Sequence, residues 1–461
     1  MKTYIIPILA VALFCLSCAP QLSMPDVDIP SEYIYGNVAT ADSVGSYWWR
    51  IYNDEVLDSL ELQALKNNKD LTVAALRVES ARYNLAVARS SFLPSINAEV
   101  SAESEYQTKQ GESYEFTLQP TISWSVSLFG ALRNTKREAQ AELLSSVWAR
   151  RGVVLSLSNE VATSYFTILQ CRRCLDIAQR SLRLREESAA LIDSMVRYGV
   201  STSLELDQAK SLVYTAAADV AQYSRALAQA QLSLATLLGE TPQTMDEKIL
   251  RGRLTIEGMP AEIPAGIPSD LLRRRPDIME SFYALQAASA RVGIARSNRF
   301  PSISITGSGG VFGSTVKELF ADGHWKWGAT GGLAQPLFNF GSLRNREKMA
   351  IVAYEESVAE YEQTVLTALE DVESALVAIS TYRAQAEEYA QYVKANGRIA
   401  ELTEALYSMG MYDYLDVIST QQTWYESQLQ MVNIVAQQYI NYANLVMALG
   451  DGWQGVVSDV K

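Results

Sequence analysis

The sequence predicts a mixed α/β membrane protein built from one duplicated unit, in which a helix and two strands precede a hairpin of two long helices. Three observations predict this class. Long stretches lack proline, segments recur at offsets of 207 and 211 residues, and two runs alternate between apolar and small polar residues. These patterns indicate long helices, an internal duplication and strands with two unlike faces.

The 13 prolines are unevenly distributed, since none lies between Thr121 and Thr241 and none follows Pro336. Proline removes a backbone donor and clashes with the preceding helical turn. Each of the two proline-free stretches can therefore hold long, uninterrupted helices.

The N-terminus is typical of an export signal. Lys2 precedes an apolar stretch, Ile5 to Leu16, which is too short to span a membrane and is followed by Cys18. The segment resembles a bacterial lipoprotein signal, and this resemblance implies that Cys18 carries a covalent lipid and begins the mature chain. Cys15 stands where such signals prefer leucine. The alternative is an ordinary signal peptide that is cut nearby.

An internal repeat organises the rest of the chain. The segment from Asp70 to Ile96 recurs 207 residues later, and the segments that begin at Phe129 and Gly199 recur 211 residues later. Such a repeat takes precedence over a domain count based on length. The expected segments are a signal peptide (1–17), a lipid-anchored segment (18–61), a first copy (62–250), a linker (251–266), a second copy (267–453) and a tail (454–461).

Each copy is expected to contain two strands, after Pro94 and after Pro301. From Ile96 to Glu103, and again from Phe116 to Leu128, apolar residues alternate with small or polar ones. Alternation over about 10 residues suits a membrane β-barrel with a wet interior, and a soluble antiparallel sandwich with one wet face is the alternative. Four strands cannot close a barrel alone, so the membrane interpretation requires oligomerisation.

The long helices carry a heptad pattern. Apolar residues with 3-4 spacing run from Val358 to Val393, which predicts a coiled-coil seam. One continuous helix from Asn345 to Met409 would span roughly 100 Å, and the stretch from Asn134 to Tyr198 has the same length.

The second copy opens with the run from Ile267 to Ile278, which contains Arg273-Arg274-Arg275-Pro276-Asp277. This run resembles the TolC-like outer-membrane efflux factors, specifically their lipoprotein branch. Ala295-Arg296 and Phe300-Pro301 fit the continuation of the family pattern. Trp48-Trp49, followed by Asp54, Leu57 and Leu60, also resembles that branch, so the match covers nearly the whole mature chain.

The resemblance implies a homotrimer whose subunits each give four strands to a 12-stranded β-barrel in the outer membrane, continuous with a periplasmic α-helical barrel. Such proteins are passive exit ducts. They open when a periplasmic adaptor protein and an inner-membrane pump dock at the tip, and they have no catalytic residues. The implied surroundings are outer-membrane lipid and the periplasm.

The family narrows where the helices turn, here after Gly199 and Gly410. The resemblance implies that Asp416 belongs to a ring of three carboxylates, which repel one another and collect cations. Ser419 stands where the family has a second aspartate, so one acidic layer is absent.

The resemblance also implies a tie between neighbouring hairpins at the same constriction. Tyr407 and Glu205 fit the tyrosine and the acid of that tie, while Tyr412 replaces the family's arginine. The alternative is that Asp416 and Glu205 are ordinary surface acids near a helix start, where the helix dipole favours them.

Cys171 and Cys174 are spaced by three residues, which brings them onto one helix face and invites a redox interpretation. Cys171 lies 211 residues before Tyr382, on the heptad seam, whereas Cys174 falls off the seam. We therefore expect a packing role for Cys171, with a redox pair as the alternative.

The composition excludes several functions. A net charge of −13 argues against nucleic acid, which requires a basic surface. One histidine leaves little room for a His-based triad or a His-rich metal site, so we expect no enzyme, no cofactor and no metal. A non-conducting structural or adhesive coiled-coil lipoprotein is the second candidate, although it does not explain the alternating strands.

Overall fold

The computed structural model describes residues 25, 27–35, 45, 47–108, 111–241, 252, 254, 268–321 and 323–453. Cys18, the predicted signal and tail, and nearly all of the linker 251–266 lie outside these residues. The chain divides into two compact units, which are described separately. Unit 1 comprises Met1–Val27, Leu76–Trp148 and Met279–Thr364, and unit 2 comprises Asp28–Ala75, Ala149–Ile278 and Val365–Lys461.

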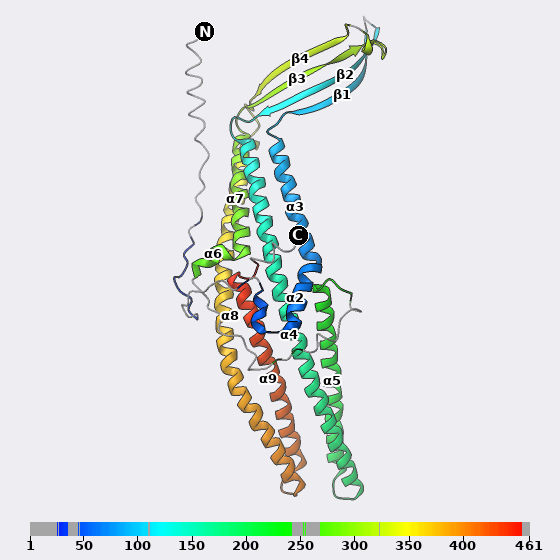
Figure 1. Cartoon of the computed structure of the whole chain (residues 1–461), viewed down its shortest axis with the longest axis vertical. Coiled ribbons are helices and arrows are strands. Elements are labelled where there is room, and N and C mark those ends of the chain that lie inside the picture. The colour runs from blue at the N-terminus through cyan, green and yellow to red at the C-terminus, as the bar shows by residue number, and fades with distance from the viewer. Residues whose placement is uncertain are drawn as a thin grey trace. The chain divides into compact units, whose positions relative to one another are not determined.

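Unit 1 contains one antiparallel sheet in the order β1-β2-β3-β4 (Figure 1). Its strands are β1 (Ser95–Gln107), β2 (Gly111–Val126), β3 (Ser302–Gly313) and β4 (Trp325–Ala334), and a short 3₁₀ turn, η6 (Glu318–Phe320), lies between the last two. The predicted strands are thus present, and the first two begin and end within a few residues of the expected positions.

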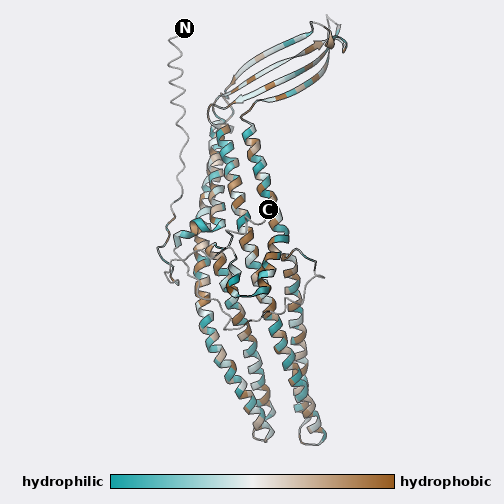
Figure 2. Ribbon diagram, in the orientation of Figure 1, coloured by the Kyte–Doolittle hydropathy of each residue, from teal (hydrophilic) through white to brown (hydrophobic). Residues whose placement is uncertain are grey.

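The two faces of the sheet differ in polarity, as the alternation predicted. In the register of the ladders, Val100 lies opposite Leu118, which lies opposite Val311. This face is apolar and exposed, and Figure 2 shows apolar residues recurring along each strand. Its exposed large side chains are Ile96, Val100, Tyr106, Tyr114, Leu118, Ile122, Trp124, Ile305, Trp325, Trp327 and Leu333. The other face carries mainly Ser, Thr, Gly and Glu, and Lys326 pairs there with Glu115 at 2.8 Å.

Pro120 interrupts the ladder between β2 and β3. Leu118 pairs with Val311 and Thr121 with Ser308, whereas Gln119 and Pro120 are skipped because proline has no N–H to donate. Gly310 lies at this point, and a side chain there would collide with the backbone carbonyl of Leu118. A glycine is therefore required where the two strands approach closely.

Four helices adjoin the sheet in sequence. They are α3 (Lys69–Ser90), α4 (Ala131–Arg197), α7 (Pro276–Ser297) and α8 (Ser342–Ser408). The parts that belong to unit 1 pack through two small apolar clusters, one around Leu85, Ala88 and Ala139 and the other around Leu285, Val292 and Tyr354. No described helix is both long and apolar enough to span a membrane.

Unit 2 contains the remaining helices and the largest core. The elements are η2 (Trp48–Tyr52), α2 (Glu55–Asn67), α5 (Ser203–Leu237), η5 (Pro268–Asp270), α6 (Leu271–Arg274) and α9 (Tyr414–Leu449). Trp48 and Trp49 are buried, and Tyr52 packs between Phe166 of α4 and Tyr439 of α9 with ring centroids 4.8 and 5.7 Å away.

Asp54 explains why a polar residue accompanies these aromatic residues. Its Oδ1 accepts from the N–H groups of Val56 and Leu57 at 2.8 and 3.2 Å, which caps α2, while its Oδ2 accepts from the Tyr165 hydroxyl at 2.7 Å. The N-terminal motif therefore acts in packing unit 2.

The predicted seam on α8 is confirmed in unit 2. Five of its residues are fully buried, namely Val365, Ala368, Val372, Ala375 and Ala386, and the others up to Val393 are half-buried. Leu366, which lies next to the seam residue Val365 but outside the seam, remains exposed in a single chain.

The Arg-Pro-Asp motif has a structural explanation, because Arg275 is buried and joins three helices. Its Nη2 lies 2.6 Å from Asp277 Oδ2 of α7 and 2.9 Å from Asp371 Oδ2 of α8, and its Nη1 donates to the Ala448 carbonyl of α9 at 3.1 Å. Gly450 ends α9 with a φ of 72°, and a side chain there would collide with the Arg275 backbone.

Candidate functional site

Both long hairpins of unit 2 turn with the same backbone geometry. Gly199 and Gly410 each have a φ of 73°, which glycine adopts without strain. The Val200 N–H donates to the Met195 carbonyl at 2.9 Å, and the Met411 N–H donates to the Leu406 carbonyl at 3.0 Å. The predicted turn positions are confirmed.

Glu205 lies at the start of α5, three residues after the N-cap residue Thr202. The Glu205 N–H donates to Thr202 Oγ1 at 3.3 Å, and the Thr202 N–H donates to a Glu205 carboxylate oxygen at 3.4 Å. The Ser201 hydroxyl also donates to this carboxylate. Within one chain, Glu205 is therefore a member of a capping box.

Asp416 occupies the equivalent place at the start of α9. It is exposed, and the N–H of the N-cap residue Asp413 donates to its Oδ2 at 3.3 Å. The carboxylate has further oxygen lone pairs that face solvent in a single chain. The local geometry agrees with the helix-start alternative and leaves the carboxylate accessible to other groups.

Tyr407 and Glu205 come from different hairpins, and Tyr407 packs against the same apolar cluster as Leu206, the residue that follows Glu205. Tyr407 packs against Tyr414 with ring centroids 5.6 Å apart, beside a cluster that includes Ile192 and Val417. Burial, and then the negative charge of Glu205, raise the pKa of Tyr407. Tyr412 lies outside this cluster. Its side chain is 48% exposed and forms no hydrogen bond within the described part of the chain.

Exposed apolar side chains surround the two turns. Each turn carries three of them at equivalent positions, 211 residues apart, and these are Tyr198, Val200 and Leu204 on one hairpin and Met409, Met411 and Leu415 on the other. Such a group of apolar residues at a solvent-exposed end is typical of a binding surface.

A buried arginine joins the hairpins further from the turns, although no motif in the sequence marks it as a functional residue. The Arg185 guanidinium on α4 donates to the Leu212 carbonyl of α5 at 3.2 Å and to Gln422 Oε1 of α9 at 2.5 Å. It also lies over the Tyr425 ring, whose hydroxyl donates to Asp219 at 3.0 Å. Burial lowers the pKa of Arg185. The available signal was its position two heptads after Cys171, where the heptad pattern would continue beyond the predicted seam.

The expectation for the two cysteines is corrected by the structure. Cys174 is the buried residue and Cys171 is only half-buried, although the seam predicted the reverse. The helix faces α5 as well as α9, since Ala178 of α4 packs in one cluster with Tyr425 of α9 and Tyr223 of α5. Both thiols are free, and burial raises the pKa of Cys174 to about 12, which makes it a poor nucleophile.

A family model described as "Outer membrane efflux protein" matches residues 61–240 and 267–451. The chain is 29% identical to the probable outer membrane lipoprotein SilC of Salmonella typhimurium over 445 residues, which cover 95% of this chain and 96% of SilC. It is 31% identical to the toluene efflux pump outer membrane protein TtgC of Pseudomonas putida, over 96% of this chain and 95% of TtgC.

Solved structures show the same similarity. The open state of the MtrE outer membrane channel of Neisseria gonorrhoeae superposes with a TM-score of 0.82 and 26% identity, over 94% of this chain and 98% of that one.

Proposed function

The chain belongs to the outer membrane efflux protein family and is the outer-membrane channel of a tripartite efflux system, and we propose that it works as a passive exit duct assembled from three copies. Members of this family are channels rather than enzymes, and they function with periplasmic adaptors and inner-membrane pumps. In the proposed arrangement the helices extend into the periplasm.

The main support for a trimer comes from the sheet. An exposed apolar face is unfavourable in water but favourable in lipid. In lipid, however, every strand edge must be paired, and the outer edges of β1 and β4 have no neighbour within the described chain. Three copies placed edge to edge would give twelve strands, with the Ser-, Thr- and Glu-bearing face lining a wet lumen.

The equal dimensions of the two halves support a duplicated unit. Helices α3 and α7 each have 22 residues and start 207 residues apart, whereas α4 and α8 each have 67 residues and start 211 apart. Asn68 precedes Arg275 by 207 residues, and its amide donates to the Leu237 carbonyl at 2.9 Å, just as Arg275 donates to the Ala448 carbonyl. A duplicated unit would place six equivalent hairpins around the axis of a trimer.

Ion conductance is the direct test of this function. Purified full-length protein added to a planar bilayer should give stepwise currents, and the detergent-extracted protein should migrate as a heat-labile trimer. Monomers that give no current would favour the non-conducting coiled-coil lipoprotein instead.

At the turns, we assign the gate to Asp416, Glu205, Tyr407 and Tyr412. Three exposed Asp416 carboxylates around a narrow axis would repel one another and attract cations. The packing of Tyr407 against the cluster that contains Leu206, next to Glu205, supports a lock between hairpins, and the exposed Tyr412 is free to contact a neighbouring subunit.

Replacing Asp416 tests the gate. Asp416→Ala should raise the closed-state current several-fold and weaken the block by multivalent cations, because the carboxylate ring is removed. Single-channel recordings measure both effects, and Asp207→Ala, which removes an exposed acid near the other turn, on α5, is the control. Unchanged current and unchanged block would remove Asp416 from the gate.

Docking at the turns would use the exposed apolar residues described above. We propose that the periplasmic adaptor covers them, since three apolar side chains on every hairpin would otherwise remain in water.

We also propose that a lipid on Cys18 anchors the mature chain to the outer membrane. The position of Cys18 after the apolar stretch supports this, as does the description of the relative SilC as a lipoprotein. Cys18→Ala should abolish labelling of the protein by a radioactive fatty acid in growing cells, while Cys15→Ala should leave it intact. Persistent labelling of Cys18→Ala would place the lipid elsewhere.

A further inference from the structure

The helix ends next to the sheet carry a positive charge that contrasts with the rest of the chain. Segments 84–90, 131–142, 290–299 and 342–352 contain ten basic and three acidic residues, a net charge of +7 in a chain whose total is −13. All four segments belong to unit 1 and lead directly into or out of its strands. We call the ten basic residues the basic band: Arg89, Arg133, Lys136, Arg137, Arg291, Arg296, Arg299, Arg344, Arg346 and Lys348.

Internal ion pairs account for only three of these residues. Arg291 pairs with Glu138 and Glu142 at 2.6 and 2.5 Å, and both Arg296 and Arg299 pair with Glu347. These pairs engage all three acids of the four segments. The other seven basic residues form no ion pair within the described part of the chain, and all of them except the half-buried Lys136 are exposed.

The C-terminal ends of α3 and α7 favour Arg89 and Arg296, but the N-terminal ends of α4 and α8 do not favour basic residues. Helices α4 and α8 both begin at the sheet, and a helix N-terminus has a partial positive charge that favours acids. The first turns of both helices nevertheless contain no acidic residue, whereas Arg133 and Arg344 lie there. A negative partner outside the chain would offset this unfavourable placement.

The surroundings of the basic band identify the kind of partner. The connection from β4 to α8 exposes Leu337, Phe338 and Phe340 almost completely. The chain therefore passes from the apolar sheet face, through exposed aromatic residues, to basic residues. The same order is found across a bilayer from the hydrocarbon core through the interface to the headgroups.

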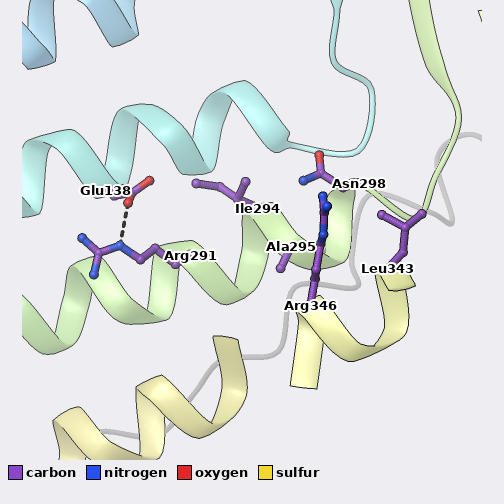
Figure 3. A pocket seen from close by; sticks show the side chains of 7 residues that line it. All are labelled: Glu138, Arg291, Ile294, Ala295, Asn298, Leu343 and Arg346. Atoms are coloured by element: carbon purple, nitrogen blue, oxygen red, sulfur yellow. Dashed lines mark hydrogen bonds and ion pairs between the residues drawn. The ribbon is translucent and has the colours of Figure 1, made fainter. Parts of the chain in front are cut away.

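One part of the basic band lies at a cavity of about 240 Å³ between α4, α7 and α8 (Figure 3). At one end of this cavity, Glu138 forms an ion pair with the Arg291 guanidinium, as the dashed line shows. Arg346 and Asn298 line the same cavity, and neither side chain has a partner within the described residues. A guanidinium and an amide provide N–H donors that suit phosphate oxygens, and the neighbouring Ile294 and Leu343 offer apolar contacts.

We propose that the basic band binds the phosphates of anionic phospholipids in the periplasmic leaflet of the outer membrane, with one lipid phosphate held by Arg346 at this cavity. This rests on the proposed function, because it requires the sheet to lie in the bilayer. The contact sets the depth at which the channel sits in the membrane.

Lipid binding by a neutralised variant tests the proposal. The variant carries Arg133→Gln, Arg137→Gln, Arg344→Gln, Arg346→Gln and Lys348→Gln. The matched control removes five exposed and unpaired basic residues of unit 2, with Arg183→Gln, Lys210→Gln, Arg225→Gln, Lys394→Gln and Arg398→Gln. Native mass spectrometry of full-length protein in an uncharged detergent counts the bound phosphatidylglycerol and phosphatidylcholine.

Wild type and control should retain phosphatidylglycerol in preference to phosphatidylcholine, and rising salt should weaken this preference. The variant should bind phosphatidylglycerol about tenfold or more weakly, given the attraction between each basic residue and an anionic surface. Equal retention by variant and control, or no preference in the wild type, would overturn the proposal. Conductance of the wild type in bilayers of phosphatidylcholine tests the channel function separately from lipid binding. If the wild type gave no current in these bilayers, the channel function would be contradicted, and not the lipid-binding proposal.

Discussion

Val100→Lys is expected to prevent insertion of the protein into the outer membrane. Val100 lies near the middle of β1 on the apolar face, with 76% of its surface exposed. A lysine on the lipid-facing side near the middle of a bilayer costs about 2–4 kcal/mol, and a trimer would contain three of them. The measurement is the amount of heat-labile trimer in the purified outer-membrane fraction.

The neighbouring residue provides the control. Ser101 lies on the polar face, so Ser101→Lys places the same charge one residue away but in the wet interior of the proposed channel. That variant should form trimers at the wild-type level. If both lysines were tolerated equally, the apolar face would not be in contact with lipid and the membrane role of the sheet would be wrong.

Arg275→Ala should destabilise unit 2 by about 1.5–3 kcal/mol, because it removes the charge-assisted hydrogen bonds of a buried guanidinium to two half-exposed carboxylates. The substitution leaves Asp371 and Asp277 without their shared cation and leaves the Ala448 carbonyl without its side-chain donor. The thermal unfolding midpoint of the purified protein, followed by far-ultraviolet circular dichroism, should fall by several degrees.

Two further variants make this expectation specific. Arg273→Ala removes an exposed arginine two residues away and should leave the midpoint unchanged. Arg275→Lys keeps the charge but cannot reach both carboxylates and the carbonyl with one planar group, so it should give an intermediate midpoint. A midpoint for Arg275→Ala equal to that of Arg273→Ala would mean that the buried contacts do not stabilise the fold.

The strands and long helices could be predicted because their signals are local. The alternation from Ile96 onward follows the two-residue period of a strand, and the seam from Val358 follows the helical period. The turns at Gly199 and Gly410 were also predictable, since a positive φ strongly favours glycine. The cysteines were assigned wrongly, because a helix that packs on two neighbours buries positions that a single seam does not mark.

At the candidate gate, too, the sequence predicted what depends on local patterns but did not predict the contacts between distant residues. The sequence identified Asp416 and Glu205 as acids near the turns, and the structure shows that both also belong to helix caps. It also shows that Tyr407 from one hairpin packs against the same cluster as Leu206 from the other, which no local pattern contains.

By itself, the sequence determined the order of the elements, the two faces of the strands and the family resemblance, because each depends on the spacing of residue types along the chain. Only the tertiary structure decided which distant groups meet, such as Arg275 with Asp371, Arg185 with Gln422, and the ion pairs within the basic band. Those contacts depend on how long helices pack side by side, and that packing fixes distances between residues that are far apart in sequence.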